Sequence, residues 1–158
     1  MKPLIPVAFA LLFALGAAAQ TVPPETPQGP PPLEVLDAAN VTLDDFLWSA
    51  RPLVIFADTS ADPRFQRQME LLASRPNALA ERDVVVITDT TPTPPGKVRE
   101  RLHPRGFALV LIDKDGTVLL RKPAPWHVRE LSRAIDKTPL RQQELKEQRD
   151  QDQLDVQP

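Results

Sequence analysis

Two adjacent hydroxyls are the residues of this sequence best placed for catalysis. Thr59 and Ser60 follow a buried apolar run, where a nucleophile could lie with one of the chain's two histidines as its base. A hydrolase nucleophile of this kind needs the pattern Gly-x-Ser-x-Gly, and Asp58 and Asp62 occupy both glycine positions. We therefore keep a cysteine-free, hydrolase-like enzyme as an alternative and expect these hydroxyls to cap a helix or satisfy a turn.

The remaining polar residues do not indicate a metal site. His103 and His127 are far apart in the sequence, on different predicted elements. Asp113 and Asp115 lie in a predicted turn, where aspartate is a good turn former. The adjacent acids Asp44–Asp45 point apart on a helix, unlike the paired carboxylates of a glycosidase, and are typical of a first helical turn. We expect no metal and no cofactor.

Composition excludes further classes of chemistry. With no cysteine, the chain has no disulfide framework, thiol nucleophile, CxxC redox pair or cysteine-ligated metal. Its 19 Lys/Arg and 21 Asp/Glu residues leave a net charge of −2. Such a balance argues against a nucleic-acid partner, which requires a basic surface to meet phosphates.

Basic residues occur in two places. The pair Asp62-Pro63 predicts a helix start, where free N–H groups could bind an anion, and Arg64 and Arg67 follow, although Asp62 itself competes with an anion. A second basic group is interrupted by an acid and is typical of a solvated face; it comprises Arg99, Arg101 and Arg105.

The N-terminus predicts export. Lys2 precedes an uncharged apolar run over 4–15, and small residues follow up to Gln20. This is the pattern of a signal peptide cleaved after about Ala19, because a membrane span needs about 18 or more apolar residues. We expect residues 1–19 to be removed, leaving a periplasmic or secreted chain without stable membrane insertion.

Composition then divides the mature chain. Six of the ten residues 23–32 are proline, which cannot join a helix or sheet interior, so 20–40 is expected to be a Pro-rich linker. Residues 41–140 carry the apolar patterns of a folded domain. Residues 141–158 are almost all charged or amide-bearing, which predicts a charged helical tail that frays.

Short apolar runs alternate with helical patterns in the domain. The runs are typical of buried strands, and the turn Asp113–Gly116 predicts a hairpin. The resulting order is β-α-β-α-β-β-α, with helices on both faces, the first three strands parallel or mixed, and an antiparallel edge. This predicts an α/β thioredoxin-like mixed sheet whose strands are Leu53–Ala57, Val84–Ile87, Phe107–Ile112 and Val118–Leu120.

Both tryptophans are interpreted as core residues. Trp48 is expected to close the first helix over the sheet edge, and Trp126 to hold the last helix on the sheet. The alternative for Trp126 is an exposed anchor for a partner.

Four segments carry a more specific resemblance. They are Leu43–Ala57 with Trp48 and Arg51-Pro52, Asp62–Leu72, Phe107–Gly116, and Ile135-Asp136-x-x-Pro139-x-Arg141-x-x-Glu144. Over Val41–Glu144 the chain resembles a secreted bacterial family, domain of unknown function 4174, which is itself similar to thioredoxin-like domains of some animal extracellular-matrix proteins. The resemblance implies fold and compartment, and no catalytic residue.

The chain departs from active thioredoxins at the decisive position. Those enzymes place cysteines after the first buried strand, where the next helix stabilises a thiolate. Here that stretch is Asp58–Arg64, and a hydroxyl there neither ionises at neutral pH nor forms a disulfide. Pro104 lies three residues before Phe107, so the cis-proline of active members is not carried over either. Thiol redox chemistry is excluded within this chain.

The fold class predicts where a ligand would bind. Ligands of open α/β sheets bind off the carboxyl ends of the parallel strands. We expect a secreted, redox-inactive domain that binds a periplasmic protein or peptide there, through backbone groups and hydroxyls. A structural envelope-interaction role using the proline spacer and charged tail is an alternative. The predicted binding residues are Asp58, Thr59, Ser60, Asp62, Arg64, Thr88 and Thr90.

Overall fold

A five-stranded mixed sheet forms the centre of the domain, in the order β1-β3-β2-β4-β5. The computed structural model describes residues 32–155, so the expected signal peptide lies outside the described residues. The first three strands in the sheet order are parallel, and the last two alternate in direction. The strands are β1 (Val35–Asp37), β2 (Arg51–Phe56), β3 (Val84–Asp89), β4 (Ala108–Ile112) and β5 (Val118–Lys122).

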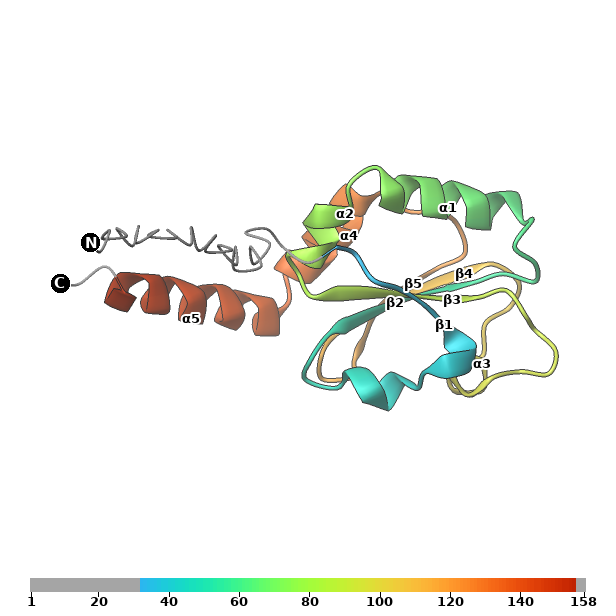
Figure 1. The fold of residues 1–158 in the computed structure, drawn as a ribbon, viewed down its shortest axis with the longest axis horizontal. Coiled ribbons are helices and arrows are strands. Elements are labelled where there is room, and N and C mark those ends of the chain that lie inside the picture. The colour runs from blue at the N-terminus through green and yellow to red at the C-terminus, as the bar shows by residue number, and fades with distance from the viewer. Residues whose placement is uncertain (1–31, 156–158) are drawn as a thin grey trace, which may run out of the picture.

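Helices cover both faces of this sheet (Figure 1). One face carries α1 (Pro63–Ala73), α2 (Pro76–Ala80) and α4 (Val128–Asp136). The other carries α3 (Lys97–Leu102) together with 3₁₀ turns at 38–40 and 43–46. This arrangement confirms the predicted thioredoxin-like fold. The first three predicted strands were expected to be parallel or mixed; they are mixed, because β4 runs antiparallel to β2.

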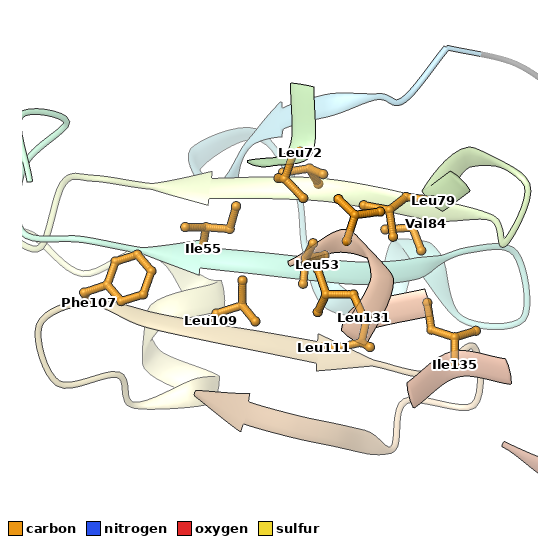
Figure 2. Close-up of a cluster of buried hydrophobic side chains, with 12 residues drawn as sticks. Leu53, Ile55, Leu72, Leu79, Val84, Phe107, Leu109, Leu111, Leu131 and Ile135 are labelled. Carbon is orange, nitrogen blue, oxygen red and sulfur yellow. The ribbon is translucent and has the colours of Figure 1, made fainter. Parts of the chain in front are cut away.

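Two apolar layers hold the helices on the sheet. Side chains alternate along β2, so Leu53 and Ile55 face α1 and α4, whereas Val54 and Phe56 face α3. Figure 2 shows Leu131 and Ile135 of α4 in the first layer, both fully buried. Full burial of a side chain of this size contributes about 1.5–3 kcal/mol, which explains why each helix has one apolar face.

The start of α1 forms as the sequence predicts. Asp62 is the N-cap, Pro63 is the first helical residue, and the Asp62 carboxylate accepts a hydrogen bond from the Arg64 N–H at 2.8 Å. The buried positions of this helix include Gln68 as well as Leu72. The Gln68 amide exchanges two hydrogen bonds with the backbone of Trp126, at 3.1 and 2.7 Å. Trp126 itself is half-buried and packs against the core, as expected.

Three local expectations need correction. Trp48 is 70% exposed instead of buried, because its left-handed backbone (φ 62°) turns the side chain outward while its N–H donates to the Lys114 carbonyl at 2.7 Å. The expected linker 20–40 contains β1, which backbone hydrogen bonds add to the edge of the sheet beside β3. The strand predicted at Leu53–Ala57 begins two residues earlier, because Arg51-Pro52 forms the start of β2.

The charged tail is helical from Pro139 onward. Helix α5 (Pro139–Asp155) has no buried residue and projects from the domain (Figure 1). Its first turns are nevertheless attached: the Arg141 guanidinium donates to the Glu81 carbonyl at 3.1 Å. In residues 32–155, no helix combines the length and apolar character needed to cross a membrane.

Candidate functional site

The carboxyl ends of β2 and β3 lie side by side, since Phe56 pairs with Asp89. Helix α1 follows β2 on one face of the sheet, and α3 follows β3 on the other (Figure 1). This divergence is the switch point at which open α/β sheets bind ligands. The predicted binding residues therefore lie at this end of the sheet, in the β2–α1 loop, the first turn of α1 and the last residues of β3 with the loop that follows.

A buried ion pair occupies the switch point. The Arg99 guanidinium donates to both Asp89 carboxylate oxygens, at 2.9 and 3.0 Å, and to the carbonyls of Asp89 and Ala57, each at 3.1 Å. It also lies over the Phe56 ring, 5.2 Å from the centroid. Our interpretation of Arg99 as part of a solvated face is therefore wrong: Arg99 is 8% exposed and its charge is matched.

The positive charge of Arg64 at the start of α1 is also paired with a neighbouring carboxylate. Arg64 donates to Asp62 from Nη2 at 2.7 Å and from Nε at 3.1 Å. These hydrogen bonds lower the pKa of the Asp62 carboxyl, so its negative charge persists at neutral pH. An anion approaching this helix end would compete with the Asp62 carboxylate for Arg64 and for the N–H groups.

The loop between β2 and α1 exposes polar side chains to solvent. Asp58, Thr59 and Ser60 are all exposed. The Thr59 hydroxyl accepts a hydrogen bond from the Ala61 N–H at 3.2 Å, the turn-satisfying role expected of it. A Cβ on Gly106 would lie 3.9 Å from Oδ2 of Asp58, so this loop adjoins the segment that leads into β4.

Thr88 and Thr90 flank Asp89 at the end of β3. The Thr88 hydroxyl donates to the Leu36 carbonyl at 3.3 Å, toward β1. Both threonines line a pocket with Asp37 and Ala39, and no residue of the β2–α1 loop lines it. The structure thus brings Asp58, Thr59, Ser60, Asp62 and Arg64 together in the β2–α1 loop and the first turn of α1, and places Thr88 and Thr90 in a different pocket.

His127 lies far from the two hydroxyls of the β2–α1 loop. His127 precedes α4 and lines a pocket with Leu71 and Ser74, at the carboxyl end of α1. Ser60 precedes the amino end of this helix, whose 11 residues span about 16 Å. Among residues 32–155, neither hydroxyl hydrogen-bonds to a histidine, and no cluster of three His, Asp or Glu residues could hold a metal ion.

A second buried ionic cluster lies at the opposite end of the sheet, and our sequence reasoning did not identify it. Arg51 is fully buried and donates to Asp113 at 2.8 Å, Glu144 at 2.9 Å and the Arg82 carbonyl at 3.0 Å. Burial would raise the pKa of Glu144, but hydrogen bonds from Arg51, Lys114 and Arg141 lower it to about 2. Because this cluster joins β2, the hairpin and α5 and both of its carboxylates accept hydrogen bonds from cations, we interpret its role as structural; Nε of Arg141 is its one buried polar atom without a partner among residues 32–155.

Neither buried ionic cluster was predicted from the sequence, because the charged partners are not marked by a local pattern. Asp89 and Arg99 are separated by a loop, and Arg51 and Glu144 by most of the domain. No local periodicity marks such partners. One signal was available in the sequence: Arg51 and Asp89 lie close to runs of buried strand residues. An unpaired charge buried there would strongly destabilise the fold, which indicates that each of the two needs a partner of opposite charge.

One family model and several solved structures match this chain. The model of the family described as "Domain of unknown function (DUF4174)" matches residues 42–144. The solved structure of the reduced 2-Cys peroxiredoxin of Plasmodium vivax is 19% identical, covering 61% of this chain and 81% of that chain with a TM-score of 0.48. StoA from Bacillus subtilis is 14% identical, with 54% and 82% covered and a TM-score of 0.43.

No curated protein matches the chain. The two solved structures are similar in fold only, so no residue role is transferred from them. The fold assignment follows from the strand order and directions described above.

Proposed function

This chain belongs to the DUF4174 family, a domain of unknown function, and we propose that it is a secreted, redox-inactive thioredoxin-like domain that binds a protein or peptide in the periplasm without catalysis. The observation that carries the proposal is the exposed loop Asp58–Ser60 at the sheet's ligand-binding end. It presents hydroxyls, a carboxylate and backbone groups, and the chain has no thiol.

The surroundings of this loop favour binding over chemistry. The two charged groups nearest the switch point, Arg99 and Arg64, are each held by a carboxylate. A catalytic site requires a base within hydrogen-bond reach of the nucleophile, and Thr59 instead accepts a bond from its own loop. A partner would therefore be held by non-covalent contacts with the loop.

Site-specific crosslinking in the native host tests the proposal. A photoreactive benzoylphenylalanine replaces Ser60 in one variant and Arg75 in a control, both exposed but at opposite ends of α1. We expect a specific adduct, identified by mass spectrometry, from position 60 and not from position 75. Absence of any specific adduct at position 60, or the same adducts from both positions, would contradict the proposed function.

Fractionation tests the compartment separately. The N-terminal sequence of the mature protein should begin at about Gln20, and the protein should be released with the periplasmic fraction. A chain that retains Met1 and stays in the cytosol would contradict the proposed export.

A further inference from the structure

A pocket beside the candidate loop combines an apolar floor with a basic rim. It lies at the same end of the sheet, because Ala108, at the start of β4, pairs with Phe56 at the end of β2. Its apolar floor is formed by Leu102 and Ala108, which are buried on the face of the sheet that α3 covers. Phe107 also lines the pocket, but it packs in the core layer on the other face.

The rim of this pocket carries an excess of positive charge. Arg105, Arg121 and Lys122 line it, together with His103, and no acidic residue does. Within residues 32–155, none of these three cations forms an ion pair with a carboxylate. This contrasts with Arg64 and Arg99 nearby, whose charges are matched by Asp62 and Asp89.

Two of these cations are also held in place. One nitrogen of Arg121 donates to the Leu102 carbonyl at 2.8 Å, which fixes the guanidinium at the pocket while its other donors stay available. Lys122 is the next residue of β5, so its side chain points to the opposite face of the sheet, where its ammonium lies 4.3 Å from the centroid of the Trp126 ring. A preorganised cation loses less conformational freedom when an anion binds.

We propose that this pocket binds the carboxyl terminus of a peptide whose last side chain is apolar. Guanidinium groups pair with carboxylates through two parallel hydrogen bonds, and the buried floor accommodates the neighbouring side chain. This inference rests on the proposed function, because it names the part of the partner that the domain would hold. The pocket adjoins the candidate loop through Gly106, near Asp58, and through Phe107, whose ring Arg64 covers at 5.4 Å.

Direct binding to the purified full chain tests the pocket. The probes are an acetylated tetrapeptide ending in phenylalanine with a free carboxyl group, and the same peptide as its amide. We expect the acid to bind at least about tenfold more tightly by calorimetry, since loss of a charge-assisted contact of about 1.4 kcal/mol changes affinity tenfold. Equal affinities, or no binding by the acid, would overturn the assignment.

Two further probes distinguish the source of the anion. N-acetyl-L-phenylalanine carries the same carboxylate and ring without the rest of the peptide, and inorganic phosphate carries charge alone. We expect both to bind more weakly than the tetrapeptide acid. Equal affinity of N-acetyl-L-phenylalanine would overturn a peptide ligand in favour of a small carboxylate, and equal affinity of phosphate would overturn the carboxylate itself.

Variants locate the binding site. Arg105→Gln and Arg121→Gln should each weaken the tetrapeptide acid about five- to tenfold, whereas the exposed Arg75→Gln should leave it unchanged. Equal weakening by Arg75→Gln, or unchanged binding in both rim variants, would refute the pocket.

The outcomes separate this inference from the proposed function. If position 60 gives adducts but the acid and the amide bind equally, the proposed function is supported and the pocket is refuted as a carboxylate-binding site. Selective binding of the acid without adducts at position 60 would support the pocket and refute only the Asp58–Ser60 loop as the surface that contacts the partner.

Discussion

Arg51 and Asp113 form a buried ion pair that joins the first residue of β2 to the residue that follows β4. Nε of Arg51 donates to Oδ1 of Asp113 at 2.8 Å, and the two side chains are 0% and 5% exposed. Asp113 also accepts from the Lys114 N–H at 2.9 Å, so the pair fixes the start of the hairpin against the neighbouring strand.

Arg51→Met should strongly destabilise the domain. The substitution keeps an apolar stem but leaves Asp113 and Glu144 without their guanidinium partner, and breaking a buried pair costs about 3–5 kcal/mol. The free energy of unfolding in urea measures the loss. As a control, Arg67→Met removes an exposed pair with Glu70 and should cost at most about 1 kcal/mol. Similar losses in both variants would contradict the structural role of Arg51.

Stability should fall in acid through Glu144. Its pKa is lowered from 4.5 to about 2 in the folded chain, so its stabilising effect is complete above about pH 5 and is lost as pH falls toward 2. Glu144→Gln should therefore destabilise most at neutral pH, with a difference from the unaltered chain that shrinks below pH 5. Urea unfolding at several pH values measures this.

The matched control for Glu144 lies farther along α5. Glu147 is exposed on the same helix, and Glu147→Gln should give a much smaller change in stability at neutral pH. A difference for Glu144→Gln that does not vary with pH would contradict the pKa argument.

Arg99→Lys should destabilise although the charge is retained. A lysine cannot reproduce the planar contacts of Arg99 with Asp89 and the Ala57 carbonyl. We expect a loss of about 2–3 kcal/mol, measured by chemical unfolding. Arg101→Lys, on the same helix but in an exposed pair with Asp44, should change stability by less than about 1 kcal/mol. An equal effect of the two variants would argue against a structural role for the buried Arg99–Asp89 pair at the switch point.

Trp48→Gly should leave stability unchanged or raise it by up to about 1 kcal/mol. Trp48 has a φ of 62°, a region that glycine adopts without steric penalty, and its exposed ring contributes little burial. Thermal unfolding measures the change. Leu131→Ala, in the buried layer, should instead cost about 2–5 kcal/mol. A loss above about 2 kcal/mol for Trp48→Gly would mean that the indole packs as originally expected.

The sheet was predictable because its signals are local. Apolar runs at 53–57 and 84–87, bounded by charged residues, marked two central strands. Gly116, with φ of 86°, occupies the turn that its sequence context indicated. Asp62-Pro63 marked the start of α1. In each case the backbone preference of one or two residues agrees with the final fold.

The rest depends on tertiary context. The strand β1 is only three residues long and joins the sheet through its backbone, so its side chains give little periodic signal. Trp48 is exposed because of a single backbone angle that hydrophobicity does not encode. Thr88 and Thr90 line a pocket beside β1 and not beside the Asp58 loop, because β1 joins the sheet at an edge that no sequence spacing reveals.

Helix α5 makes the molecule convenient to immobilise. It begins beside Arg51, at the end of the sheet remote from the Asp58 loop (Figure 1), and its 17 residues extend for about 25 Å. A dye or sensor-chip linkage placed on the exposed Asp152 would therefore leave the Asp58 loop and the basic pocket facing the bulk solvent.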